Sequence, residues 1–389
     1  MTHDMGRGAP GQPGAYGPYP PGGPYGPGGW APPPPAPQPG VVPLRPLDVG
    51  DILKGVFSTL GRYWKPLFGS ALVAHLVAVL VTGGALVAAY LSYEDLLNAF
   101  WDGVRAGGTG LPDPAALGPV MLAFAGVWLV GMLAMAAAGA FVAAACPAVL
   151  QDAAIGRPAR VGAVLRRAAS ALLPVLAWAL LGGVITIVPT ALLVTGFYAV
   201  LLGMLTRFGG PDLLDLPGWL GPLMMLAGVA LLPLAVWLWV RISLVPAVVV
   251  LEAQGLVGAL RRSALLVRGS WWRIFGILLL GAVLAAVASA VLQLPFSWAA
   301  AVPEPSFGTD PEASMPSLGG VLTLMATSMA FSMVGQLVAQ TVTAAFPPLV
   351  ASLLYVDQRI RTENLAASLA EAAGMPRPAP AAAPPTVTE

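Results

Sequence analysis

The stretch ALLPVLAWALLGGVITIVPTALLVTGFYAVLLGML, residues 171–205, contains no charged side chain. About 20 apolar residues in a helix span the hydrocarbon core of a bilayer, so this stretch is long enough to cross it. Six such stretches occur in the chain, at residues 66–91, 117–150, 171–205, 220–250, 274–298 and 321–354. They lack the alternating pattern of a transmembrane barrel, and lipid admits only helices or closed barrels. The sequence therefore predicts an all-α polytopic membrane protein with six transmembrane helices.

The composition agrees with a lipid environment. Hydrophobic residues make up 57% of the 389 residues and charged residues only 10%, which is too little charge to cover a soluble globule of this size. The net charge of +1 argues neither for nor against nucleic acid, but no basic run with interleaved aromatic residues occurs, so we expect no nucleic-acid partner. The single cysteine, Cys146, excludes an intramolecular disulfide and a cysteine-rich metal site.

Lysine and arginine concentrate on one side of the predicted membrane. Seventeen of the nineteen belong to the terminal segments and to the connections that follow the second and fourth stretches, whereas Arg105 and Arg207 lie in the alternate connections. Basic residues resist translocation, so we expect both termini in the cytoplasm. Arginine far exceeds lysine, and Ala, Gly and Pro are abundant, which suggests a GC-rich bacterial genome and hence a bacterial cytoplasmic membrane.

The membrane region is flanked by two segments of a different composition. The first forty residues contain thirteen prolines and eleven glycines, and residues 374–389 are rich in Pro and Ala. Segments of this kind do not bury a core. We therefore expect a disordered cytoplasmic tail at 1–43, a six-helix transmembrane domain with interfacial helices at 44–373, and a second disordered tail at 374–389.

Three basic segments resemble one another: VGDILKGVF from Val49, VGAVLRRAA from Val161 and VGALRRSAL from Val257. Each precedes an odd-numbered apolar stretch and shows helical amphipathic periodicity. The chain therefore predicts three helical hairpins that point the same way, each preceded by a short amphipathic interfacial helix, as a parallel repeat about the membrane normal. Residues 357–373 are expected to form a fourth such helix without a hairpin.

The cations of these segments are candidate lipid contacts. An amphipathic helix with a basic face lies in the membrane interface, where anionic headgroups attract each Lys or Arg by about 1 kcal/mol. The candidate contacts with anionic lipids of the inner leaflet are Arg166, Arg167, Arg261, Arg262 and Arg268. The alternative is that these arginines only enforce topology and pack as a cytoplasmic collar.

Three further segments carry a resemblance. They are RPLDVGDILKGVF from Arg45, VPAVVVLEAQGLVGALRRSALLVRGSWWRIFGILLL from Val245 and SLLYVDQRIRTENLAASLAEAAG from Ser352. Together they resemble a family of bacterial membrane proteins named after the membrane domain of glycerophosphoryl diester phosphodiesterases. The resemblance implies a multi-span membrane module without the catalytic barrel found beside it in some relatives, because such a barrel needs about 250 residues of its own. It therefore implies no phosphodiesterase activity.

Polar side chains recur every four residues on the last two apolar stretches, and residues four apart share a helix face. They are Ser289, Gln293 and Ser297 on the fifth, and Ser328, Ser332, Gln336 and Gln340 on the sixth. The two stripes are expected to meet and form hydrogen bonds that pack the helices. The alternative is a hydrophilic groove for a lipid headgroup or a small solute.

His75 lies about ten residues into the first apolar stretch, near the middle of the membrane. A charged imidazole is unfavourable there, so we expect a neutral ring that is hydrogen-bonded to another helix. The alternative roles are a proton relay or a contact with a substrate.

The sequence contains no P-loop, HExxH, Gly-x-Ser-x-Gly or Cys/His metal spacing, so we expect neither enzymatic activity nor a cofactor. No acidic residue lies deep in an apolar stretch, which argues against an ion-coupled carrier. The first hypothesis is a non-enzymatic module that organises membrane lipids or membrane-protein partners. The second is a passive transporter of lipids or small solutes.

Overall fold

The computed structural model describes residues 45–105, 114–208, 217–301 and 318–363, which belong to one compact unit. Every regular element in these ranges is a helix. Six helical stretches are long and apolar enough to cross a membrane: Trp64–Leu96, Gly118–Ala154, Leu172–Arg207, Leu220–Glu252, Trp271–Trp298 and Ala330–Glu363. The protein is therefore an all-α polytopic membrane protein, as predicted. The proposed tails at 1–43 and 374–389 lie outside the described residues.

The first hairpin consists of α2 (Trp64–Arg105) and α3 (Pro114–Ala154), which pack along each other and follow the amphipathic helix α1 (Val49–Arg62). One face of α1 is buried through Ile52 and Val56, whereas Lys54 is exposed. This division is what an interfacial helix with one apolar face requires. The first transmembrane helix extends beyond its apolar stretch and has a non-helical residue, Tyr93, at a kink.

The second hairpin pairs α5 (Leu172–Arg207) with α6 (Leu220–Ile242) and follows α4 (Val161–Ser170). Glycines let the two backbones approach closely: a Cβ on Gly196 would lie 2.7 Å from the backbone nitrogen of Met225 and 2.8 Å from the carbonyl oxygen of Gly221. Small residues at such crossings permit close helix packing in membranes. The fourth span then breaks and continues as α7 (Val245–Glu252).

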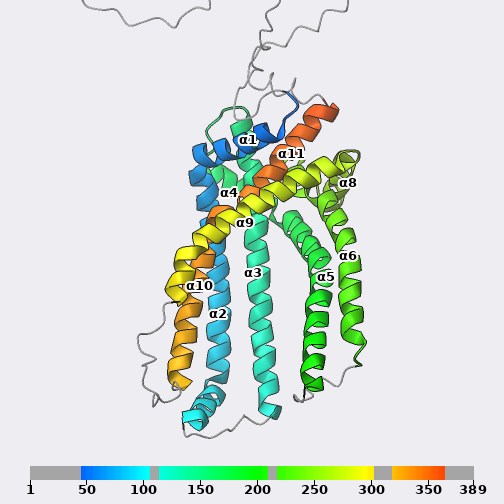
Figure 1. The fold of residues 1–389 in the computed structure, drawn as a ribbon. Helices are drawn as coiled ribbons and strands as arrows, with labels where there is room; N and C mark the ends of the chain where they lie inside the picture. Colours follow the sequence, from blue (N-terminus) through cyan, green and yellow to red (C-terminus); the bar gives the residue numbers. More distant parts are fainter. Residues whose placement is uncertain (1–44, 106–113, 209–216, 302–317, 364–389) are drawn as a thin grey trace, which may run out of the picture. The chain divides into compact units, whose positions relative to one another are not determined.

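The third hairpin pairs α9 (Trp271–Ala301) with α10 (Leu318–Thr343) and follows α8 (Leu256–Val267). The sixth span also breaks and continues as α11 (Phe346–Glu363). Figure 1 shows α9 crossing obliquely in front of α3, and it shows α1, α8 and α11 gathered at one end of the spans. The predicted repeat of three hairpins, each preceded by an amphipathic helix, is confirmed.

Residues 357–363 do not begin a separate interfacial helix, so the predicted fourth amphipathic helix is wrong for this part of the chain. They continue α11 without a break. Side-chain bonds one turn apart accompany this continuation: Arg361 Nε donates to Asp357 at 2.9 Å and Thr362 Oγ1 donates to the carbonyl oxygen of Gln358 at 2.8 Å. Residues 364–373 of the predicted helix lie outside the described residues.

The two helix breaks are buried, and neighbouring side chains bond the carbonyl groups that they release. Trp178 Nε1 donates to the carbonyl oxygen of Ile242 at 2.7 Å, and Ser263 Oγ donates to that of Arg241 at 2.7 Å. At the second break, Cys146 Sγ lies 3.5 Å from the carbonyl oxygen of Ala345. Irregular backbone at membrane depth is stable only where protein groups satisfy it in this way.

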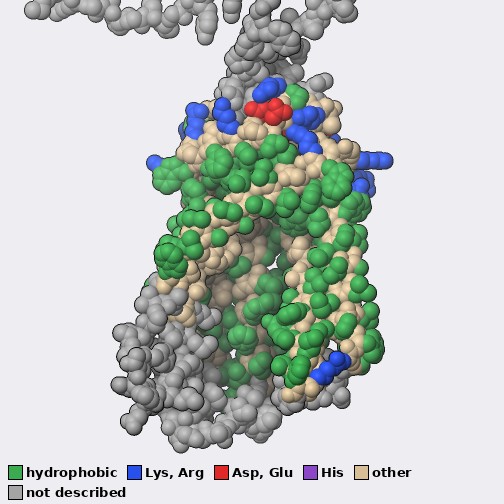
Figure 2. Space-filling model, viewed as in Figure 1, with side chains coloured by type: hydrophobic (Ala, Val, Ile, Leu, Met, Phe, Trp, Pro, Cys, Tyr) green, Lys and Arg blue, Asp and Glu red, His purple; other side chains and the backbone are tan. Residues whose placement is uncertain are grey.

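The buried core lies toward the end that carries the amphipathic helices. It includes the last turns of α3, the helices α7 and α11 that follow the breaks, and large buried side chains such as Leu150, Leu244, Leu353 and Tyr355. Farther along the spans, large apolar side chains are exposed, as on a surface that faces lipid. The space-filling view shows this division on one face, with most of the visible basic side chains at one end and hydrophobic ones over the spans (Figure 2).

The close approach of α5 and α6 predicts opposite effects for two glycines of one helix. Gly196→Ala forces a methyl group against the backbone of α6 and should destabilise the protein by about 1–3 kcal/mol. Gly183→Ala is the control, because its methyl group meets no atom within 4 Å and alanine is the better helix former by about 1 kcal/mol. Thermal unfolding in detergent measures both, and equal melting temperatures for the two variants would contradict this packing.

Candidate functional site

The carboxylate of Asp357 is fully buried at the end of the helices where the amphipathic segments gather. It accepts hydrogen bonds from the Leu47 N–H at 2.8 Å and from Arg273 Nη1 at 2.5 Å. Arg361 Nε donates to both carboxylate oxygens, at 2.9 and 3.1 Å. We call this set of four residues the Asp357 clasp, because it connects the segment before α1 with α9 and α11.

The backbone of Leu47 is the other half of the clasp. Its carbonyl oxygen accepts from Arg273 Nη2 at 2.6 Å and from Arg361 Nη2 at 3.0 Å. Leu47 is 1% exposed and precedes the first turn of α1, so neither of its backbone polar groups is satisfied by helix hydrogen bonding. Buried backbone groups require partners, and the clasp supplies them from helices more than two hundred residues away.

A second network surrounds Glu252 at the end of α7. Its carboxylate accepts from the hydroxyl of Tyr355 at 2.5 Å and from Arg262 Nε at 3.2 Å. Arg262 also forms an ion pair with Glu363, to which Arg359 donates at 2.9 Å. Burial alone would lower the pKa of Arg262, but its hydrogen bonds to Glu363 and Glu252 outweigh that effect and raise it. The network joins α7, α8 and α11.

The acid at the corresponding place in the first hairpin forms a simpler contact. Asp152, near the end of α3, pairs with Arg167 of α4 at 3.2 Å, and the two side chains are 19% and 43% exposed. Asp152, Glu252 and Asp357 each follow a proline of an even-numbered span and each pair with arginine. The sequence showed the shared position of the acids but not their partners.

Most cations at this end have no acidic partner. The described part of α1, α4, α8, α11 and the adjoining span ends and connections contains fifteen Lys and Arg but six Asp and Glu. Five of these acids form ion pairs with arginine. Eight exposed cations form no ion pair with the described residues: Lys54, Arg62, Lys65, Arg157, Arg160, Arg166, Arg261 and Arg268. They leave a net positive surface at this end (Figure 2).

The five candidate lipid contacts divide into two groups. Arg166, Arg261 and Arg268 are exposed and form no ion pair within the described ranges. Arg167 and Arg262 are held in the ion pairs with Asp152 and Glu252. The structure thus separates the arginines that hold helices together from those that face outward, and contact with lipid stays a prediction for the second group.

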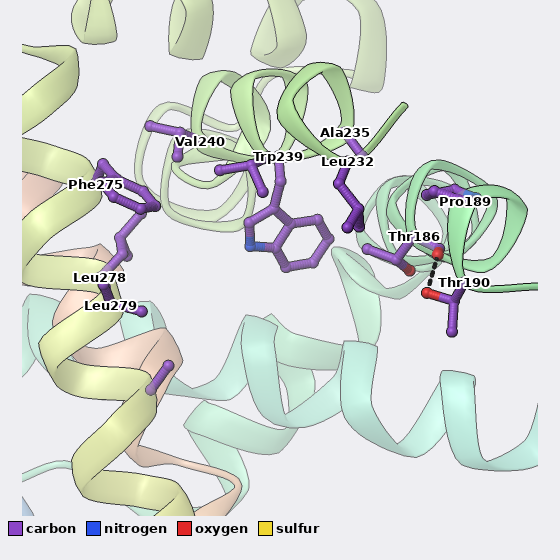
Figure 3. Close-up of a pocket in the computed structure, with 12 residues that line it drawn as sticks. Thr186, Pro189, Thr190, Leu232, Ala235, Trp239, Val240, Phe275, Leu278 and Leu279 are labelled. Carbon is purple, nitrogen blue, oxygen red and sulfur yellow. Dashed lines mark hydrogen bonds between the residues drawn. The ribbon is translucent and has the colours of Figure 1, made fainter. Parts of the chain in front are cut away.

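A groove lies within the membrane between α5, α6 and α9, with a volume of about 300 Å³. In Figure 3, Trp239 projects from α6 between Phe275 of α9 and Thr186 of α5. The hydroxyl of Thr190 donates to the carbonyl oxygen of Thr186 at 2.8 Å, so this polar side chain is satisfied within its own helix. The groove therefore presents an almost entirely apolar lining, which suits a hydrocarbon chain better than a polar solute.

The two polar stripes lie on α9 and α10, as expected. Within α9, Gln293 Nε2 donates to Ser289 Oγ at 3.1 Å and Ser297 Oγ donates to the carbonyl oxygen of Leu294 at 2.9 Å. On α10, Ser332 Oγ donates to the carbonyl oxygen of Ser328 at 2.8 Å.

Between these helices, a small residue makes a close contact. A Cβ on Gly335 would lie 2.7 Å from the Cβ of Phe296, whereas the neighbouring Gln336 is exposed and Gln340 is half-buried. The side chains of Ser289, Gln293, Ser297 and Ser332 thus form hydrogen bonds within their own helices. A groove or a bond between the two stripes stays a prediction.

His75 is buried, but its hydrogen bond differs from the expectation. Its Nδ1 lies 2.7 Å from the carbonyl oxygen of Ala71, one turn earlier in α2, so the expected bond to another helix is replaced by one within the same helix. Polar side chains in helices often bond the carbonyl group four residues before them. A proton relay or substrate contact at His75 stays a prediction.

A known protein family matches most of the chain. A family model described as "Domain of unknown function (DUF7847)" matches residues 47–356. The chain belongs to this DUF7847 family. The matched region begins at Leu47 of the clasp and ends one residue before Asp357, so the DUF7847 domain includes the first five transmembrane helices and most of the sixth. No curated protein and no solved structure matches the chain.

The Asp357 clasp predicts that two acids at corresponding positions contribute unequally to stability. Asp357→Asn leaves two arginines next to an uncharged, buried partner and should destabilise the protein by about 3 kcal/mol. Asp152→Asn removes a partly exposed ion pair and should cost less than about 1 kcal/mol. Thermal unfolding in detergent measures the difference.

Hydrogen–deuterium exchange of the Leu47 N–H gives a local measure of the same clasp. It should accelerate in Asp357→Asn because Leu47 loses its anchor, and it should not change in Asp152→Asn. Similar melting temperatures and similar exchange rates at the Leu47 N–H in both variants would show that the clasp does not hold the hairpins together.

Proposed function

We propose that this DUF7847 protein is a non-enzymatic module of the bacterial cytoplasmic membrane that organises anionic lipids or partner proteins at the inner leaflet. The observation that carries the proposal is the set of eight exposed cations without ion pairs at one end of the described helices. The opposite end has a different charge: the described residues there include Glu94, Asp95 and Asp102 with Arg207. Because basic residues resist translocation, such asymmetry supports a cytoplasmic position for the basic end.

The placement of the amphipathic helices supports lipid as the partner. Each buries its apolar face in the protein, through Ile52 in α1, Val164 in α4 and Ala259 in α8. Their exposed cations therefore face away from the core at the level where spans begin. Anionic headgroups attract each such cation by about 1 kcal/mol, so several together bias the surrounding lipid strongly.

A module of this kind needs no catalytic group. Among the described residues, no cluster of three or more His, Cys, Asp or Glu is arranged to hold a metal ion. The buried acids at this end form ion pairs with arginine. Their carboxylates therefore hold helices together instead of facing a substrate. The resemblance to the membrane domain of glycerophosphoryl diester phosphodiesterases supports the same view, since that domain is the non-catalytic part.

The groove between α5, α6 and α9 favours a second function, passive movement of lipid across the membrane. Its apolar lining matches an acyl chain, and Ala282 and Leu279 of α9 lie on its wall. A lipid path needs a polar route for the headgroup as well, and the residues that line the groove do not provide one. The organising role is therefore the better supported of the two.

Removal of outward-facing cations should lower the preference for anionic lipid. In the triple variant Arg166→Gln, Arg261→Gln and Arg268→Gln, we expect the enrichment of phosphatidylglycerol over phosphatidylcholine to fall by about fivefold per cation removed. Native mass spectrometry of the protein from mixed micelles measures this enrichment. Arg207→Gln at the other end is the control and should change nothing.

Two results would argue against the organising role. One is equal retention of both lipids by the unsubstituted protein. The other is rapid scrambling of a labelled phospholipid by proteoliposomes, blocked by Ala282→Trp in the groove, which would favour the transport function.

Orientation can be tested with single cysteines, because Cys146 is the only native cysteine and is buried. Arg207→Cys should react with a membrane-impermeant maleimide added to intact spheroplasts. Arg166→Cys should react only after the membrane is permeabilised, because the positive end faces the cytoplasm. The unsubstituted protein controls for reaction at Cys146, and the reverse labelling pattern would invert the proposed topology.

A further inference from the structure

A cavity of about 470 Å³ lies where α1 meets α2 and where the connection between α3 and α4 approaches them. Its lining includes side chains and backbone from both segments: Arg62, Trp64, Lys65, Gly156, Ala159 and Val161. In contrast to the groove between α5, α6 and α9, nearly half of its exposed lining is polar. None of the five candidate arginines lies in it.

The cavity is positively charged and contains no acid. Arg62 and Lys65 are both exposed, and neither forms an ion pair with the described residues. The first turns of α2 and α4, which contribute Trp64, Lys65 and Val161, carry no acidic residue. Arg157 and Arg160 lie beside the lining residues in the connection. Two cations that share one cavity repel each other unless an anion lies between them.

The walls of the cavity are held in place by the protein itself. The hydroxyl of Tyr63, a buried side chain, donates to the carbonyl oxygen of Arg157 at 3.0 Å and so fixes the connection against the corner between α1 and α2. The connection turns at Gly156, which has a φ of 73°, and the Arg157 N–H returns to the carbonyl oxygen of Asp152 at 2.9 Å. The site is therefore formed before any ligand binds.

The position of the cavity relative to the lipid headgroups indicates which anion reaches it. Trp64 is 52% exposed, and Lys65 Nζ lies 5.8 Å from the centre of its ring. Tryptophan at the end of a span lies at the level of the lipid headgroups, and the apolar part of α2 begins directly after these residues. A phosphate attached to a lipid is the abundant anion at that level.

We infer that this cavity binds the phosphate of an anionic phospholipid headgroup, with Arg62 and Lys65 as its cationic contacts. The inference rests on the proposed lipid-organising function and adds a defined site to it. Diffuse attraction by the outward-facing arginines enriches many lipids weakly, whereas a preformed cavity holds one lipid tightly. The two kinds of binding differ in the number of lipids held per protein and in how strongly they depend on the shape of the cavity.

Three variants test the site by native mass spectrometry with phosphatidylglycerol in detergent micelles. The double variant Arg62→Gln and Lys65→Gln removes the charges, and we expect it to bind the single tightly held lipid about thirtyfold more weakly. Ala159→Trp keeps every cation but fills the cavity, and it should also lose that lipid. Arg261→Gln with Arg268→Gln removes two exposed cations of α8 and its C-terminal cap and should retain it.

The outcomes separate this inference from the proposed function. If the α8 double variant weakens binding as much as the cavity double variant, and Ala159→Trp has no effect, the attraction is diffuse and the cavity site is wrong. If the unsubstituted protein binds phosphatidylglycerol no better than phosphatidylcholine, both fail. Soluble glycerol phosphate is a further probe: equal binding of this compound would assign the cavity to a free phosphate ester rather than to a lipid. Melting temperatures show that each variant is folded.

Discussion

The buried carboxylate of Asp357 is the interaction on which the arrangement of the hairpins depends. Removal of a carboxylate from water is strongly unfavourable unless charge and hydrogen bonds replace the solvent. Here Arg273, Arg361 and the Leu47 N–H replace it, and the same two arginines satisfy the carbonyl group of Leu47. Because these groups come from the segment before α1, from α9 and from α11, the clasp brings the two ends of the membrane domain together.

The acids at this end also determine which cations are available. Glu252, Glu363 and Asp152 hold arginines of α4, α8 and α11 in ion pairs, and these contacts set how the amphipathic helices lie on the core. Eight of the remaining cations are exposed, and five of the six acids at this end are already paired with arginine. Thus a basic surface and a tightly packed interior result from the same small number of carboxylates.

The broken spans explain why packing is uneven along the membrane. The helices α7 and α11, which follow the two breaks, are largely buried among their neighbours. The carbonyl groups freed just before them are bonded by Trp178, Ser263 and Cys146. Away from this end the hairpins rely on close contacts such as that of Gly196 with α6. The apolar groove beside Trp239 lies between two of them.

The sequence by itself determined six spans, three amphipathic helices and their common direction, because length, periodicity and charge asymmetry are local properties of the chain. Tertiary structure decided which polar groups meet. Arg166 and Arg167 are adjacent and alike in sequence, yet only Arg167 reaches Asp152, since neighbours on a helix face different directions. Leu47 and Asp357 are 310 residues apart, and the cavity at Arg62 and Lys65 takes part of its lining from a distant connection. Such contacts follow from how the hairpins pack.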